Sequence, residues 1–286
     1  MMEDRIVVDK PLSQKVSKYG YKAFTTGFIL IVLIITYLPI FVMALTSFTS
    51  DPLGYRFNSY TLDWYLKLFD NGDLRDSIVF TLEITFLSTL ISTIFGTMSA
   101  IGINSLSKKA KKRIIILNNV PILNADIVTA VFLLIIFQVV SLIIHVNVIS
   151  QYSFITTLIA HVLFSTPYVV LSVLPKLGKD NSLFEAAMDL GCSPSAALFK
   201  VVIPNIKSGI FSGMLLAFTM SIDDFIITYF VSASNDNFST WLYGNLRTLR
   251  NGQWNQACAY NTILMLITFV GIIAYNLLAG KKKKSK

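Results

Sequence analysis

The sequence predicts an all-α polytopic membrane protein with six transmembrane helices. Of its 286 residues, 54% are hydrophobic and only 14% are charged, whereas roughly 25% of the residues of an ordinary soluble domain are charged. A helix needs about 20 consecutive apolar residues to cross the hydrocarbon core of a bilayer. Six stretches meet this requirement: residues 23–46, 78–103, 114–140, 154–174, 208–232 and 256–279.

Each stretch contains few or no charged side chains, as a membrane-spanning helix requires. The first, 23–46, carries none, is too long for a signal peptide and has no small-residue cleavage site after it, so we expect it to be retained. The second contains Glu83, the third Asp126, and the fifth Asp223 and Asp224. The fourth and sixth contain no carboxylate, lysine or arginine. Each can span a bilayer with its backbone hydrogen bonds closed internally.

The distribution of lysine and arginine predicts the orientation. Taking alternate connections together, 19 of the 24 basic residues fall on the side of the chain that holds both termini and the connection 175–207. By the positive-inside rule this side is cytoplasmic. The net charge is +8. We interpret the basic residues at 108–113 and in the tail as anchors to an anionic inner leaflet, and not as a nucleic-acid binding site.

Cysteine, histidine and tryptophan give weaker signals. The two cysteines, Cys192 and Cys258, do not support a disulfide framework. Neither His145 nor His161 has a cysteine or carboxylate at ligand spacing, so we expect each to satisfy a local hydrogen bond, and we expect no metal and no cofactor. The three tryptophans lie in the predicted outer connections, at positions 64, 241 and 254. They fit an aromatic belt at the outer interface better than a docking surface for an extracellular protein.

The acids within the predicted spans are the first clue to function. The spans contain Glu83, Asp126, Asp223 and Asp224 but no lysine or arginine. A central Asp costs about 2.5 to 3.5 kcal/mol on insertion scales, so such groups usually face a bundle interior or a watery cavity. Because adjacent residues diverge by about 100° around a helix, Asp223 and Asp224 cannot both face a pathway, and one is expected to cap or pair with a neighbour. The alternative for each acid is an internal hydrogen bond.

A polar insert, EAAMDLGCSPSAALFKVVIP at residues 185–204, separates the fourth and fifth stretches. Ser182 and Glu185 form a capping-box pattern that predicts a helix start. Gly191 can end that helix in the left-handed conformation, and Ser193 with Pro194 predicts the start of a second helix that runs toward Val202. We expect Pro204 to break this helix before the fifth span. Taken alone, the insert could also fold against the chain's own span ends.

The insert resembles the EAA motif of ABC transporter permeases, in which Glu-Ala-Ala, three residues, Gly, nine residues and Ile-x-Leu-Pro follow one another. The residues that match at this spacing are Glu185, Ala186, Ala187, Gly191 and Pro204. The resemblance implies a MetI-like permease whose coupling helix docks on an ATP-binding subunit present in two copies. The chain has no G-x-x-x-x-G-K-[ST] phosphate loop, so we expect no ATPase activity of its own.

A wider resemblance, over residues 20–279, is to permeases of spermidine and putrescine importers. It is carried by ILNADIVTAVFLLIIF, HVLFSTPYVVLSVLPKL and SIDDFIITYFVS. It implies a second permease subunit and an extracellular polyamine-binding protein as partners in a bacterial cell membrane. The implied organisation is a cytoplasmic segment 1–22, a six-span permease domain 23–279 with the coupling loop 175–207, and a cytoplasmic tail 280–286.

The cargo prediction has a physical basis beside the resemblance, because several ammonium groups would suit spans that contain only acids. The alternatives are a permease for another small solute, such as a metal chelate or an osmolyte, and an intramembrane enzyme. The sequence has no H-E-x-x-H motif, and adjacent aspartates on one helix do not form a catalytic pair.

Overall fold

The computed structural model describes residues 12–51, 59–70, 72–178, 182–233, 235–245 and 252–283. Within these ranges every regular element is a helix, and the β pairing consists of one isolated antiparallel bridge between Thr49 and Tyr60. The chain divides into two compact units, the first made of Met1–Leu68 and Thr248–Lys286 and the second of Phe69–Arg247. The all-α prediction is confirmed.

The first unit contains α1 (Leu12–Thr46), α2 (Asp63–Leu66) and α13 (Gln253–Lys283). Asn255, near the start of α13, is fully buried and its side-chain amide donates to the carbonyls of Thr46, Thr49 and Asp51 at 3.2, 3.3 and 3.0 Å. These bonds tie the end of α1 to the start of α13. The apolar window of α1 has no buried residue within the chain, so its side chains are free to face lipid or a partner.

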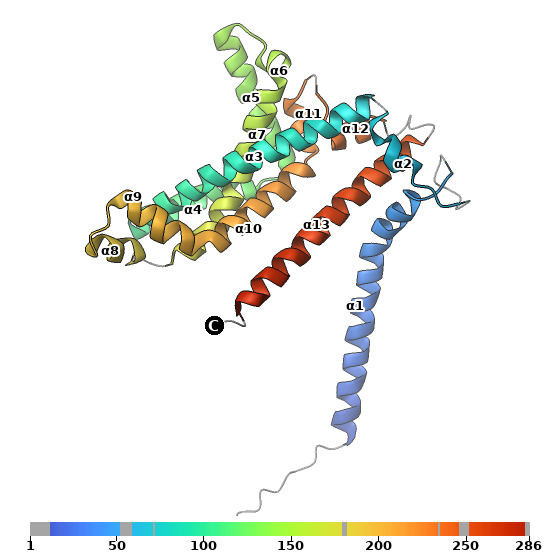
Figure 1. Ribbon diagram of the computed structural model, residues 1–286, viewed down its shortest axis with the longest axis horizontal. Helices are drawn as coiled ribbons and strands as arrows, with labels where there is room; N and C mark the ends of the chain where they lie inside the picture. The colour runs from blue at the N-terminus through green and yellow to red at the C-terminus, as the bar shows by residue number, and fades with distance from the viewer. Residues whose placement is uncertain are drawn as a thin grey trace, which may run out of the picture. The chain divides into compact units, whose positions relative to one another are not determined.

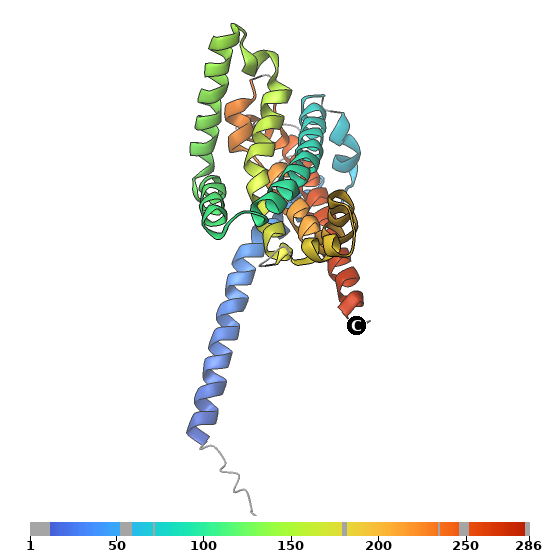
Figure 2. The ribbon, with the colours of Figure 1, turned by 90° about the vertical axis from the view of Figure 1, so that its left-hand side faces the viewer.

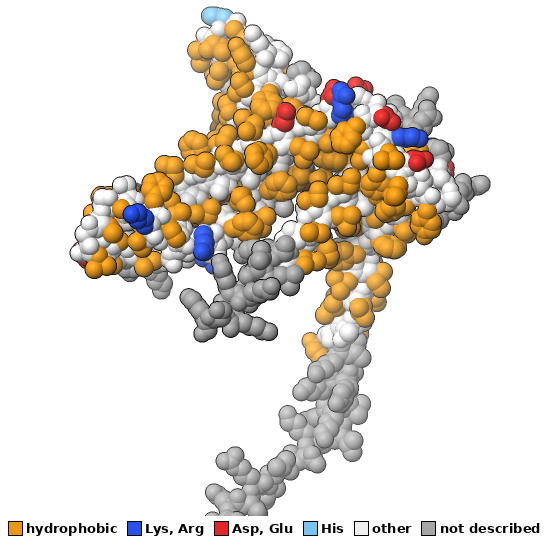
Figure 3. All heavy atoms as spheres, in the orientation of Figure 1, with side chains coloured by type: hydrophobic (Ala, Val, Ile, Leu, Met, Phe, Trp, Pro, Cys, Tyr) orange, Lys and Arg blue, Asp and Glu red, His pale blue; other side chains and the backbone are white. Residues whose placement is uncertain are grey.

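The second unit is built on α3 (Gly72–Asn104), α7 (Ser153–Val173) and α10 (Ile203–Ile222), which pack against one another (Figures 1 and 2). The remaining elements are α4 (Lys108–Leu123), α5 (Asp126–Ile144), α6 (Val148–Gln151), η2 (Leu174–Leu177), α8 (Ser182–Asp189), α9 (Pro194–Ala197), η3 (Leu198–Val202), α11 (Ile226–Val231) and α12 (Phe238–Asn245). Hydrophobic side chains cover most of the face in Figure 3, and charged side chains are sparse on it.

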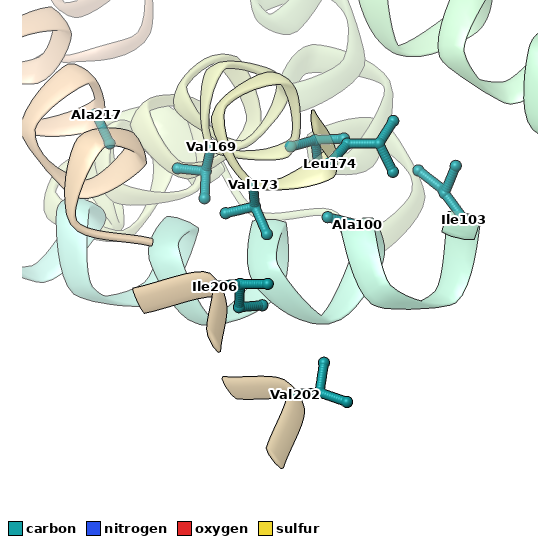
Figure 4. Close-up of a cluster of buried hydrophobic side chains, with 9 residues drawn as sticks. Ala100, Ile103, Val169, Val173, Leu174, Val202, Ile206 and Ala217 are labelled. Carbon is teal, nitrogen blue, oxygen red and sulfur yellow. The ribbon is translucent and has the colours of Figure 1, made fainter. Parts of the chain in front are cut away.

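Glycines let these three helices approach closely. A Cβ on Gly96 of α3 would lie 2.6 Å from Val169 Cβ, and one on Gly213 of α10 would lie 3.1 Å from Val169 Cα. Close backbone approach at small residues is a principal source of packing energy between helices in lipid. The buried cluster beside this contact includes Ala100, Val173 and Ile206 (Figure 4).

Five helices are long and apolar enough to cross a membrane: Phe24–Thr46, Gly72–Asn104, Asp126–Ile144, Ser153–Leu177 and Pro194–Ile222. These five are counted among the described residues only. The sixth predicted stretch, 256–279, lies within α13. The count of six spans and the cytoplasmic position of both termini stay predictions, as do the domain boundaries.

The expectation of an unbroken third helix was wrong. The stretch 114–140 is divided between α4 and α5 by extended backbone at Asn124 and Ala125, whose ψ angles are 150° and 140°. Pro121 removes one hydrogen bond from the last turn of α4, and asparagine and aspartate compete with the helix through local hydrogen bonds. Asp126 then begins α5, where the positive end of the helix dipole favours a carboxylate.

The expectation that Pro204 breaks the helix was also wrong, because the fifth candidate span runs without interruption from Pro194 to Ile222. The turn at Leu198–Val202 is wider than an α-helical turn, and the N–H of Ile203 bonds to the carbonyl of Leu198, five residues earlier. In a regular α-helix the ring of a proline clashes with the carbonyl four residues before it. A π-type turn inserts one residue, so the helix accommodates Pro204.

Candidate functional site

The fifth predicted stretch, 208–232, is not one continuous helix as expected, because it is interrupted after α10. Asp223, Asp224 and Phe225 separate α10 from α11. The buried carboxylate of Asp224 accepts hydrogen bonds from the backbone N–H of Ile227 at 3.2 Å and from the N–H and hydroxyl of Thr228, each at 2.8 Å. Asp224 therefore caps the first turn of α11 and satisfies donors that the helix leaves unpaired. Asp223 is exposed, so the two side chains have different surroundings. Both aspartates lie between two helices and not on the one continuous helix that we had expected.

His161, in the middle of α7, joins the Asp224 cap to the helix bundle. Its side chain is 1% exposed. Nδ1 lies 2.7 Å from Ser221 Oγ, and Nε2 lies 3.0 Å from Thr228 Oγ1 and 3.4 Å from Asp224 Oδ2. His161 makes hydrogen bonds, as expected, but they are not local, because its partners are 60 and 67 residues away in the chain.

The network extends in both directions from His161. Ser221 Oγ lies 2.9 Å from Ser88 Oγ on α3. On the other side, the buried side-chain amide of Asn237 donates to the Asp224 carbonyl at 2.5 Å and to Thr228 Oγ1 at 3.1 Å. Together these contacts connect α3, α7, α10 and α11 and fix the backbone at the break, since buried polar groups that are fully paired rigidify a core.

Three of the four predicted acids meet at one hollow. A cavity of about 330 Å³ is lined by Asp126, Asp223 and Asp224, together with the aromatic rings of Phe164 and Phe225. Asp126 is the first residue of α5, directly after the break from α4, and the two other aspartates lie in the break between α10 and α11. Interrupted helices at membrane depth are tolerated where they line a cavity, and transporters use such breaks to bind ions and substrates.

Glu83 lies apart from these acids. It is an exposed residue of α3 and lines a second hollow, of about 760 Å³, together with Asp73, Asp76 and Asp236. Arg75 also lines it and pairs with Asp76, with Nη2 and Oδ1 3.0 Å apart. Glu83 is therefore not grouped with the other three span acids. It lies on α3 at a hollow that is also lined by residues of α12.

The polar insert forms the short helix α8, then a tight turn as predicted, and then α9, which continues through η3 into α10. Gly191 has a φ of 84°, in the left-handed region, and ends α8. The Ser193 hydroxyl accepts from the N–H of Ala196 at 3.3 Å and caps α9, which begins at Pro194. The predicted capping interaction of Ser182 lies outside the described side chains. Within the motif, Glu185, Ala186 and Gly191 are exposed and Ala187 is buried.

The insert packs on its own spans with one side only. Phe184 and Leu198 contact the hydrophobic cluster shared by α3, α7 and α10. In contrast, Leu190 and Phe199 are 87% and 66% exposed. The insert therefore folds in part against the ends of its own spans, which was one alternative. Its other apolar side stays exposed and is available for the docking that the second alternative requires.

Two of the three tryptophans differ from the expected aromatic belt. Trp64 and Trp241 are 8% and 5% exposed, each within its own unit, whereas Trp254 is 39% exposed. Trp64 packs against Gly252, where a Cβ would come within 2.0 Å of its ring, and its Nε1 donates to the Thr49 carbonyl at 2.7 Å. A belt role is left only for Trp254.

Comparisons with known proteins give one consistent family. Residues 92–284 match the family model described as "Binding-protein-dependent transport system inner membrane component". The chain is 29% identical over 257 residues to the spermidine/putrescine transport system permease protein PotC of Haemophilus influenzae, covering 89% of this chain and 96% of that protein. It is 29% identical over 251 residues to the putrescine permease PotI of Escherichia coli K12, with coverage of 87% and 88%.

The fold comparison agrees with the family. A chain from the crystal structure of a bacterial ABC transporter that imports the acidic polysaccharide alginate superimposes with a TM-score of 0.68 at 15% identity. The match covers 94% of this chain and 98% of the other. At this identity the likeness concerns the fold alone.

Proposed function

Since the chain belongs to the family of binding-protein-dependent transport system inner membrane components, we propose that it forms part of the translocation pathway for a polyamine. The grouping of Asp126, Asp223 and Asp224 around one hollow carries this proposal. A cation that reaches the hollow meets carboxylates from two interrupted helices. No lysine or arginine lies in the predicted spans, so neither of these permanently charged groups is there to neutralise the acids.

The shape of the hollow suits an alkyl ammonium. Phe164 and Phe225 line it beside the acids, and aromatic faces attract ammonium groups by about 0.5 to 2 kcal/mol. The methylene segments of a polyamine can lie on such rings while its charged ends approach Asp126 and Asp223. The sequence identity to permeases named for spermidine and putrescine supports the same cargo.

The polar insert supplies the connection to ATP. We assign Glu185, Ala186, Ala187, Gly191 and Pro204 to coupling with an ATP-binding subunit, two copies of which would serve the importer. The exposed Leu190 and Phe199 provide the apolar contact that such docking needs. Because Leu198 at the same insert packs on the core of the spans, movement of the insert reaches the bundle directly.

The remaining partners follow from the family. A second permease subunit would complete the pathway, and a polyamine-binding protein outside the cell would deliver the cargo. In this arrangement both termini and the insert lie in the cytoplasm, and the protein is a non-catalytic subunit of the bacterial cell membrane. Glu83, with the other acids of the larger hollow, would attract the cation before it reaches Asp223.

The test is reconstitution of the chain with its ATP-binding subunits, second permease and binding protein in liposomes. Spermidine and putrescine should stimulate ATP hydrolysis and enter the liposomes. Diacetylated spermidine is the matched control, because it keeps the carbon chain but has fewer positive charges. Equal stimulation by the acetylated compound, or stimulation only by an unrelated solute such as an osmolyte, would refute polyamine transport.

A further inference from the structure

A third hollow, of about 730 Å³, lies between the start of α4 and the end of the fourth candidate span. Lys108, Lys111 and Lys112 line one side of it together with Ile115 and Ile116, and the opposite side includes Leu174 and Pro175. None of the described residues that line this hollow is acidic. It shares no lining residue with the two carboxylate-lined hollows, and the function proposed above assigns it no role.

The spacing on α4 makes this lining a single helical stripe. Positions 108, 111, 112, 115 and 116 follow the pattern i, i+3, i+4, i+7 and i+8, so their side chains share one face of the helix. The first part of that face is basic and the next turn is apolar. Lys109 and Arg113 are also exposed residues of α4, but they do not line the hollow.

The hollow lies where two candidate spans end, at Asn104 and at Leu177. The ammonium group of Lys111 donates to the side-chain oxygen of Asn104 at 2.7 Å, which fixes the stripe against the end of α3. Span ends lie at the boundary between hydrocarbon and head groups. The basic half of the stripe therefore faces the head-group layer, and the isoleucines continue toward the hydrocarbon.

We propose that this hollow binds one anionic phospholipid, with its phosphate between Lys108 and Lys112 and its acyl chains along Ile116 and Leu174. Charge complementarity selects an anion, and the apolar half of the lining selects a lipid over a soluble phosphate. Basic pockets between helices on the cytoplasmic side suit anionic head groups. The site would bind a lipid of the surrounding membrane, and this proposal does not depend on which cargo the protein transports.

The experiment compares two double variants of the full chain in its purified complex, each lacking two positive charges on α4. Lys108→Ala/Lys112→Ala changes the hollow, and Lys109→Ala/Arg113→Ala is the matched control outside it. Phosphatidylglycerol is titrated onto each complex in detergent, and the first bound lipid is counted by native mass spectrometry. One lysine near an anionic head group is worth about fivefold in affinity, so we expect the first double variant to bind about 25-fold more weakly and the control to change less than about threefold.

Three further measurements identify the ligand. Phosphatidylcholine should bind more weakly than phosphatidylglycerol, and inorganic phosphate should not compete with it at equal concentration. Ile116→Asn should weaken phosphatidylglycerol binding without altering any phosphate binding. Equal losses of phosphatidylglycerol affinity in the two double variants would mean that only the general surface charge matters. Competition by inorganic phosphate would indicate a site for small anions instead. Either result would overturn the proposal.

Discussion

His161 Nε2 lies 3.4 Å from Asp224 Oδ2, and the two side chains are 1% and 7% exposed. The first residue belongs to α7 and the second to the break between α10 and α11. Because Asp224 also caps α11 through Thr228, this contact attaches the interrupted part of the fifth span to the fourth. The exposed Asp223 next to it is thus carried on a backbone held by buried groups.

Replacement of His161 tests this attachment. His161→Ala removes one hydrogen-bond partner from Ser221 and one from Thr228, and each such bond contributes about 0.5 to 1.5 kcal/mol. We expect a clear fall in the thermal midpoint of the purified complex and a smaller fall for His161→Gln, which keeps one N–H donor. His145→Asn is the control, because His145 is exposed with a φ of 55° and asparagine tolerates that conformation. A wild-type midpoint for His161→Ala would contradict the attachment.

Asp223→Asn tests the pathway. This change keeps the shape of the side chain but removes its charge, so we expect the KM for spermidine uptake to rise about two- to fivefold, in line with an exposed ion pair. Assembly of the complex should be unaffected. Asp224→Asn should instead lower thermal stability, since both carboxylate oxygens accept hydrogen bonds and the amide nitrogen of asparagine cannot. A buried N–H donor is then left unpaired, at a cost of about 1 to 3 kcal/mol. Unchanged uptake kinetics for Asp223→Asn would exclude this residue from the pathway.

Gly191 gives the sharpest test of coupling. A Cβ at this position would meet nothing within 4 Å, so only the φ of 84° constrains the residue. Proline fixes φ near −65°, and we expect Gly191→Pro to distort the turn and to raise the number of ATP molecules hydrolysed per cargo molecule imported. Gly191→Asn should stay near the wild-type ratio, because asparagine enters the left-handed region readily. Normal uptake by the proline variant would refute the coupling role.

Gly96 tests the packing of α3 on α7. In Gly96→Ala the new methyl group would lie 2.6 Å from Val169 Cβ, and overpacking of this kind costs about 1 to 3 kcal/mol. Gly102→Ala, on the same helix, meets nothing within 4 Å and should leave the midpoint of thermal unfolding in detergent unchanged. Equal midpoints for the two variants would show that the close approach does not contribute to stability.

The sequence alone determined the features that depend on neighbours along the chain. Long apolar stretches predicted the membrane helices because a helix closes its hydrogen bonds locally. The turn at Gly191 and the cap at Ser193 were predicted correctly for the same reason, since each depends on residues within one helical turn. The relation to the permease family was also visible in these local residues.

Only the tertiary structure decided which distant residues meet. Asp126, just after the break at Asn124, lines the same hollow as Asp223, while Glu83 lines a different one. Periodicity gives the face of a helix that a residue occupies, but not the helix against which that face packs. His161 had one available signal, an ionisable group within a predicted span; its partners, Ser221 and Thr228, could not be inferred. Local backbone chemistry therefore determined the helices and turns, and long-range packing of those helices determined the candidate site.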